Sequence, residues 1–172
     1  DITDKKNTEN ALKESEELFK NLIELAPYGI ILNDREGRHL LVNKAYCIDS
    51  GFEANELIGK THEEIGLKFK EGSIHFMREE IRNKGFFKNF ETSYQSKNGN
   101  IVYCLYSSKI LQINDQKAVL TSSVNITDKK KIENELEKYR DHLEKLVKER
   151  TDELAAINEE LSATNEELYA QK

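Results

Sequence analysis

The sequence predicts an α+β domain, an antiparallel sheet with helices on one face, set between two helical connectors. Three strand patterns separated by tight-turn residues fill residues 86–126, and two shorter ones lie near residue 30. Short helical patterns separate these two groups of strands. Stretches without glycine or proline before and after them, at residues 7–26 and 132–172, predict the two connectors.

The composition limits the classes of function. Charged residues make up 34% of the 172 residues and hydrophobic residues 37%, which is polar for one globule and indicates a compact domain plus solvated helices. The net charge of −6 argues against a nucleic-acid partner, which needs a basic surface. No apolar run approaches the roughly 20 residues of a membrane span. We therefore expect a cytoplasmic segment without membrane contact of its own, in a parent protein whose membrane attachment is left open.

The sequence also argues against a catalytic or metal site. Cys47 and Cys104 form no CxxC pair and have no histidine at metal-ligand spacing, so we expect two reduced thiols. A phosphoacceptor histidine of a kinase is normally followed by proline, but Pro27, the only proline, precedes His62 and His142. Glycine-rich nucleotide motifs are absent. The chain is predicted not to be an enzyme.

An internal repeat sets the domain boundaries. Residues 1–6 read DITDKK, and residues 125–130 read NITDKK. The simplest interpretation is a tandem array, in which each copy ends one domain and begins a helix. We therefore expect the tail of a preceding domain with a linker helix at 1–13, a central domain at 14–128 and a C-terminal helix at 129–172. The chain would then be a segment of a longer protein.

The first half of the domain begins with a helix over residues 7–26, which Pro27 ends. Short strands at 28–32 and 39–43 flank the turn 34–38 and form a hairpin. Helices follow, ended or started by glycine and serine. Their predicted ranges are 44–50, 53–58, 61–68 and 73–85.

The second half is β. In the strand at 86–94, Phe86, Phe90 and Tyr94 are predicted to face the same way. Residues 97–100 (KNGN) are a strong hairpin turn before a strand at 101–113. The strand at 117–126 alternates, with one predicted apolar face: Ala118, Leu120, Val124 and Ile126. Three strands in a meander and the first hairpin make a five-stranded antiparallel sheet, with a hollow where helices cover it.

In this order and spacing, the segments resemble the PAS sensor domain over about residues 14–128. The segments that carry the resemblance are 16–19 (EELF), 26–30 (APYGI), 41–45 (LVNKA), 56–60 (ELIGK), 97–99 (KNG) and 125–128 (NITD). The resemblance implies a ligand-sized pocket in a bacterial signalling protein. Such domains often sit in tandem upstream of a histidine kinase or a cyclic-dinucleotide enzyme, either of which the parent protein can carry. The family's closing motif is Asp-Ile-Thr, whereas this chain has Asn125 and lacks the charge.

The residues favour neither of the family's common cofactors. Haem-binding members ligate iron through a histidine on the helix before the third strand, but His75 lies about a quarter-turn from the stripe of Ile74, Met77 and Ile81 and is predicted to face solvent. Flavin-binding members carry Asn-Cys-Arg-Phe, whereas Cys47 lies in a YCID segment. The cofactor is therefore unknown. For a small organic ligand, the candidate pocket residues are Asn43, Cys47, Tyr103, Tyr106 and Ser122.

The C-terminal helix has a coiled-coil pattern. Its seam positions are spaced by three and four: Ile132, Leu136, Tyr139, Leu143, Val147, Arg150, Leu154, Ile157, Leu161, Thr164 and Leu168. This pattern predicts a homodimer. Tyr139, Leu143 and Val147 are spaced four and four, a stutter where Leu146 competes for the seam. Glu149, Arg150 and Thr151 resemble the Glu-Arg-Thr signature of signalling helices.

These observations predict a non-catalytic module that relays a change of ligand or neighbouring domain, through a dimeric coiled coil, to an output domain such as a histidine kinase. A ligand-free dimerisation spacer and a haem-bound gas or redox sensor are the alternatives. The predicted relay residues are Asn125, Ile126, Thr127, Asp128, Leu143, Leu146, Val147, Glu149, Arg150 and Thr151.

Overall fold

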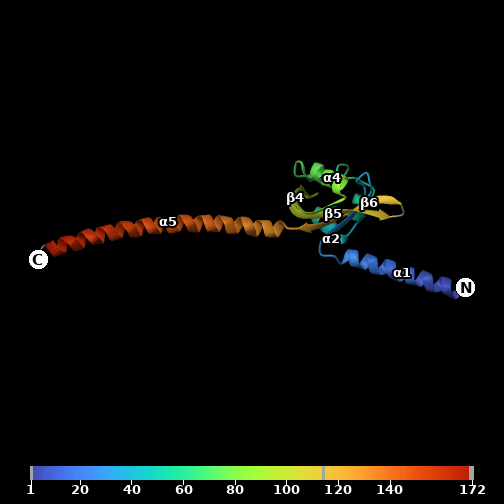
Figure 1. The fold of residues 1–172 in the computed structure, drawn as a ribbon, viewed down its shortest axis with the longest axis horizontal. Coiled ribbons are helices and arrows are strands. Elements are labelled where there is room, and N and C mark those ends of the chain that lie inside the picture. Colours follow the sequence, from blue (N-terminus) through green and yellow to red (C-terminus); the bar gives the residue numbers. More distant parts are fainter. Residues whose placement is uncertain (1, 114, 171–172) are drawn as a thin grey trace. The chain divides into compact units, whose positions relative to one another are not determined.

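The structure is a computed structural model that describes residues 2–113 and 115–170. Side chains are described for residues 6–113 and 115–166, so the predicted seam residue Leu168 and most of the repeat copy at 1–6 lie outside the described side chains. The chain divides into two compact units, Asp1–Thr127 and Asp128–Lys172, and each is described by itself (Figure 1).

The first unit confirms the α+β fold with an antiparallel sheet. Its elements are α1 (Ile2–Glu24), β1 (Gly29–Asn33), β2 (His39–Val42), α2 (Lys44–Ser50), α3 (Ala54–Leu57), β3 (Lys68–Phe69), α4 (Ser73–Lys84), β4 (Phe86–Gln95), β5 (Ile101–Ile113) and β6 (Gln116–Asn125). Among the described residues, six strands form one sheet in the order β2-β1-β6-β5-β4-β3. The N-terminal hairpin therefore joins the meander through the antiparallel pair of β1 and β6.

The strand β3 and the turn before it stand where the sequence predicted a helix. Residues 61–68 were expected to be helical, but they form a turn that ends at Gly66, whose φ of 75° is left-handed. The chain then leaves in the extended conformation, and Phe69 pairs with Tyr94 at the edge of β4. The helical prediction was wrong here because the signal for β3 is a pairing with a distant strand.

The predicted face of β4 is also wrong in part. The register of β4 with β5 shifts between Phe87 and Phe90, and Asn89 in the irregular segment has a φ of 54°. Such a bulge reverses the alternation of side chains on one side of it. Phe87 and Tyr94 are therefore buried, while Phe86 is 47% exposed.

The predicted apolar face of β6 is only partly buried. Ala118 is buried as predicted, whereas Leu120 and Val124 are 37% and 40% exposed and the polar residues Thr121 and Ser123 are buried instead. The inner hydroxyls find partners on the neighbouring strand, since Thr121 Oγ1 and Ser108 Oγ lie 2.8 Å apart. The inner side of the sheet thus combines a hydrophobic cluster with small polar side chains.

The helix α4 covers the inner face of the sheet (Figure 1). The partly buried residues Met77 and Ile81 of α4 pack against the cluster around Phe87 and Tyr106. Gly85 ends the helix with a φ of 77° and donates its backbone N–H to the carbonyl of Ile81 at 3.0 Å. The second unit is α5, a single helix over Thr127–Ala170.

Candidate functional site

A cavity of about 590 Å³ lies between α4 and the inner face of the sheet. This volume is within the range of small-molecule sites. Its walls are largely apolar and come from both layers: Ile31, Phe69, Ile74, Met77, Ile81, Phe87, Ile110 and Val119. The apolar stripe of α4, read as Ile74, Met77 and Ile81 from the sequence, therefore faces a cavity as well as the core.

The cavity wall also carries uncharged polar groups, some paired and some not. The Tyr106 hydroxyl and Asn33 Oδ1 have no hydrogen-bond partner among the described residues. The hydroxyls of Ser108 and Thr121 share a hydrogen bond. His39 Nδ1 lies 2.6 Å from the carbonyl oxygen of Lys60, which assigns the proton to Nδ1. Burial lowers the pKa of His39 and also that of His62, which lines the same cavity. Both imidazoles are therefore neutral at pH 7.

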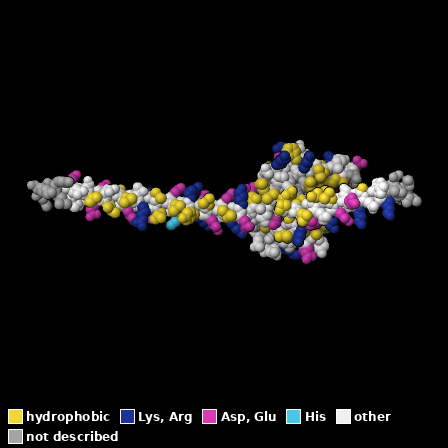
Figure 2. Space-filling view, turned by 90° about the horizontal axis from the view of Figure 1, so that it is seen from below, with side chains coloured by type: hydrophobic (Ala, Val, Ile, Leu, Met, Phe, Trp, Pro, Cys, Tyr) yellow, Lys and Arg dark blue, Asp and Glu magenta, His cyan; other side chains and the backbone are white. Residues whose placement is uncertain are grey.

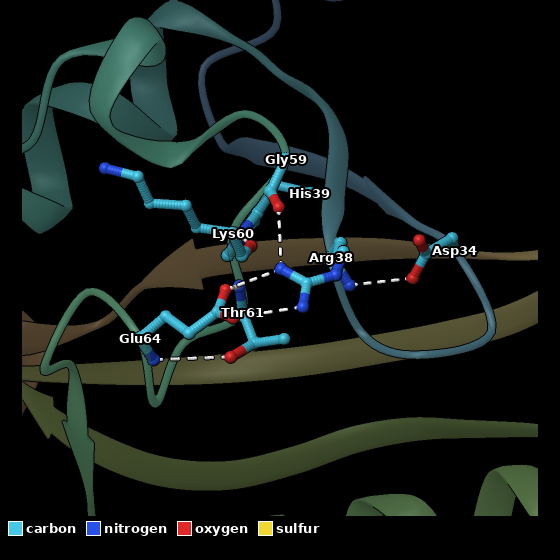
Figure 3. A network of polar contacts seen from close by, with 7 residues as sticks. All are labelled: Asp34, Arg38, His39, Gly59, Lys60, Thr61 and Glu64. Carbon is cyan, nitrogen blue, oxygen red and sulfur yellow. Dashed lines mark hydrogen bonds and ion pairs between the residues drawn. The ribbon is translucent and has the colours of Figure 1, made fainter.

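An ion-pair network holds the hairpin turn at the cavity rim (Figure 3). The Arg38 guanidinium donates to both carboxylate oxygens of Glu64, at 2.6 and 3.0 Å, and to the carbonyl of Gly59 at 2.9 Å. Asp34 Oδ1 accepts from the backbone N–H of Arg38 at 2.8 Å. Hydrogen bonds from Arg38 and from the backbone N–H of Thr61 lower the pKa of Glu64. The β1–β2 turn is thereby tied to the loop 59–64.

The five predicted pocket residues lie in different places. Tyr106 lines the cavity. Tyr103 and Ser122 belong to the opposite face of the sheet, because they alternate with the buried Cys104, Thr121 and Ser123. Cys47 packs against the core cluster from α2, and Asn43 is fully buried at the start of that helix. Of the five predicted pocket residues, therefore, Tyr106 lines the cavity and the other four do not.

Asn43 is a structural junction. Its Oδ1 accepts from the backbone N–H of Ile30 at 2.8 Å and of Tyr46 at 3.1 Å. Its Nδ2 donates to the carbonyls of Ile23 at 2.9 Å and Tyr28 at 3.0 Å. One buried amide thus caps α2 and ties it to β1 and to the end of α1.

Cys104 lies at the centre of the core, fully buried beside Tyr94, Tyr106 and Ser123. Burial raises the pKa of the Cys104 thiol to about 11 and raises the pKa values of Tyr94 and Tyr106 as well. The thiol and both phenols are therefore protonated at neutral pH. Since thiolate is the reactive form, Cys104 acts as a packing residue, a role that its neighbours on three strands create.

The predicted surface position of His75 is confirmed. Its side chain is 79% exposed and lies 3.4 Å from Glu79 across one helical turn. A haem iron in the cavity would need a ligand from the cavity wall, which His75 does not supply. In the described part of the chain, no group of three or more His, Cys, Asp or Glu is arranged to hold a metal ion. No described helix is long and apolar enough to cross a membrane.

The end of β6 is fixed to the domain by Asn125 and Thr127. Asn125 Nδ2 donates to Asp49 Oδ1 at 2.7 Å, and Asn125 Oδ1 accepts from the backbone N–H of Thr127 at 2.9 Å. Two further bonds join this segment to Tyr103 of β5. Thr127 Oγ1 accepts from the backbone N–H of Tyr103 at 3.0 Å, and the backbone N–H of Ile126 donates to the carbonyl of Tyr103 at 2.8 Å. The predicted relay residues 125–127 therefore lie where β6 ends and α5 begins.

These contacts explain why an amide stands at position 125. Asn125→Asp would place a second carboxylate against Asp49, and we expect it to lower the free energy of unfolding by about 1–2 kcal/mol at pH 7. Urea titrations followed by tyrosine fluorescence measure this loss. The double variant Asn125→Asp with Asp49→Asn should recover most of it, because the pair again has one donor. Equal midpoints for Asn125→Asp and Asn125→Ala would contradict the repulsion.

The remaining relay residues lie on α5. Leu143 and Leu146 are each 40% exposed and Val147 is 63% exposed. Arg150 Nη1 pairs with Glu153 at 2.6 Å, and Thr151 Oγ1 donates to the carbonyl of Val147 at 2.7 Å. Apolar side chains recur along this helix between charged ones (Figure 2).

Two sets of known proteins are similar to this chain. The virulence sensor protein BvgS of Bordetella pertussis is 38% identical over 66 residues, which are 38% of this chain and 5% of that protein. A PAS domain from a two-component sensor histidine kinase superposes with a TM-score of 0.57 at 19% identity, over 66% of this chain and 97% of the other. The PAS domain of an HTR-like protein from Haloarcula marismortui gives 0.60 at 20% identity, over 70% and 99%.

The structural likenesses concern the fold, and the curated relatives share only a small segment of their length. The sequence model of the family adds the decisive match, because it covers more than half of the chain. It matches residues 27–128, from the end of α1 to the start of α5. This chain therefore belongs to the PAS domain family.

Proposed function

We propose that this chain is a non-catalytic sensory relay module of a bacterial signalling protein, acting in the cytoplasm as a homodimer. Residues 14–128 would sense a ligand or the state of a neighbouring domain. Residues 1–13 would connect to a preceding sensor, and residues 129–172 would pass the change to an output domain such as a histidine kinase. The similarity to sensor proteins supports this assignment.

The exposed seam of α5 is the observation that carries the proposal. Nine apolar seam residues are between 40% and 66% exposed in the single chain: Ile132, Leu136, Tyr139, Leu143, Leu146, Val147, Leu154, Ile157 and Leu161. Apolar residues repeated at heptad spacing over this length are buried in a coiled coil. A second copy of the same helix supplies a matching seam by symmetry.

The register break gives the relay a moving part. Around Leu146 and Val147, two seams compete, and their packing free energies differ by only a few kcal/mol. A change in the domain would reach this segment through Asn125, which binds Asp49 of α2 and the N–H of Thr127, and through Thr127, which accepts from Tyr103 of β5. The sensor would then select one of two registers.

Deletion of residues 144–147 tests the relay in the full-length protein. The deletion restores a continuous spacing of three and four across the break, so we expect output that no longer responds to the signal. Deletion of the whole heptad 155–161 is the matched control, because it shortens the helix but keeps the break. A normal response after the four-residue deletion would make α5 a static spacer.

Two measurements separate this proposal from its alternatives. Native mass spectrometry of the purified chain would detect a co-purified small molecule, which a ligand-free dimerisation spacer lacks. A visible absorbance spectrum would reveal haem and so favour a gas or redox sensor. The cavity between α4 and the sheet favours the ligand-binding sensor.

A further inference from the structure

The charges around the cavity have one predominant sign. Four cationic side chains line it, namely Arg35 in the β1–β2 turn, Arg78 and Arg82 on α4, and Lys117 on β6, against the carboxylates of Asp34 and Glu36. The whole chain carries a net charge of −6. This local excess of positive charge therefore opposes the overall charge of the protein.

Most of these cations are not neutralised by neighbouring carboxylates. Arg78 pairs with Glu63 at 2.7 Å, and Asp34 is engaged by the backbone of its own turn. Within the part of the chain that the structure describes, no ion pair involves Arg35, Arg82 or Lys117. All three are exposed, and they come from three elements that surround one cavity.

The interior of the cavity does not call for a charged ligand group. Much of its wall is apolar, and the hydroxyls of Ser108 and Thr121 bind each other. The two polar atoms without a partner, the Tyr106 hydroxyl and Asn33 Oδ1, are uncharged, and the two lining histidines are neutral because burial lowers their pKa values. A charge placed deep in such a site would lose its hydration without a partner. A charge at the rim would keep part of its hydration and meet Arg82 and Lys117.

From this arrangement we infer that the cavity binds a small amphipathic monoanion, an aliphatic or aromatic carboxylate. The apolar body lies against Ile74, Met77 and Ile81, and the carboxylate lies at the rim beside Arg82, Lys117 and Arg35. This inference deepens the proposed sensory function, because it gives the chemical class of the signal. The geometry assigns recognition to two independent contributions, burial of the body and pairing of the head group.

Three probes of equal chain length separate these contributions: octanoate, octanol and octylammonium. Isothermal titration of the purified 172-residue chain should give the tightest binding for octanoate, with octylammonium at least about tenfold weaker. Lengthening the chain from hexanoate to octanoate should tighten binding by about fourfold per methylene group. Equal affinity for octanoate and octylammonium would overturn the inference, as would no binding of octanoate at millimolar concentration.

Variants locate the binding. Arg82→Gln with Lys117→Gln should weaken octanoate by about tenfold and leave octanol unchanged. Arg140→Gln with Lys145→Gln removes the same charge from α5 and is the matched control, with no expected effect. Charge reversal by Arg82→Glu with Lys117→Glu should favour octylammonium over octanoate.

A further variant tests the cavity itself. Met77→Trp fills the space beside the apolar stripe and should abolish binding of all three probes, with circular dichroism verifying that the domain is folded. Octanoate binding that survives Met77→Trp would place the ligand elsewhere and contradict the inference. The four-residue deletion in α5 tests the relay without any ligand of this class, so failure here is distinguishable from failure of the proposed function.

Discussion

Replacing Asn43 by alanine is expected to destabilise the domain by about 2–4 kcal/mol. The substitution removes the cap of α2, a loss of about 1 kcal/mol. It also leaves the carbonyls of Ile23 and Tyr28 and the N–H of Ile30 without their partner. Buried polar groups that lose a partner cost about 1–3 kcal/mol. Because Asn43 is fully buried, water does not replace the amide without rearrangement.

Urea unfolding of the purified chain, followed by tyrosine fluorescence, measures this effect as a shift of the midpoint at constant slope. Asn83→Ala is the matched control, since Asn83 is an exposed residue of α4 and should change stability by less than about 0.5 kcal/mol. A loss below about 1 kcal/mol for Asn43→Ala would show that the amide is not the junction between α1, β1 and α2.

The second large effect is expected in the seam of α5. The wild-type chain, with a mass of 19.9 kDa, should sediment as a dimer at tens of micromolar. Leu154→Asp with Ile157→Asp places charges at two adjacent seam positions in each copy. The loss of two large apolar contacts per chain should weaken dimerisation by roughly a thousandfold or more. The variant should therefore sediment as a monomer.

The neighbouring alanines supply the control. Ala155→Asp with Ala156→Asp adds the same charge one residue away, outside the heptad seam, and should leave the dimer intact. Circular dichroism would verify that both variants retain the sensor domain. Dimers in both variants would move the interface away from α5, and a monomeric wild-type chain would contradict the coiled coil.

Local signals in the sequence predicted most of the elements. Pro27 follows the end of α1, Gly85 ends α4, and the KNG segment at 97–99 turns β4 into β5, as the structure has them. Each of these signals acts within a few residues, through a missing N–H group or a left-handed backbone. The repeat of ITDKK predicts a domain end at residue 128, and α5 begins at Thr127.

The roles of single residues depended on contacts that sequence distance hides. Asn43 was predicted as a pocket residue, but backbone groups of Ile23, Tyr28, Ile30 and Tyr46 use all of its side-chain hydrogen-bonding capacity. The cations of the inferred anion site are Arg35, Arg82 and Lys117. They are far apart in the sequence, so no local pattern indicates that they lie around one cavity. Arg38 likewise binds Glu64, 26 residues along the chain, only because the folded hairpin carries it to the loop 59–64 (Figure 3). Asp34 fixes the turn from which Arg38 extends.

By itself, then, the sequence determined the order of helices and strands except for β3, the family, and the apolar seam of the last helix, because each is written in a local pattern or a short motif. Only the tertiary structure decided which strand faces are buried, what surrounds the cavity and why position 125 carries an amide. Because of a bulge in β4, the apolar residue Phe86 is exposed. The polar residues Ser108 and Thr121 are buried because their hydroxyls bind each other between β5 and β6. Strand register and cross-strand pairing are long-range properties, and they fix which side chains meet.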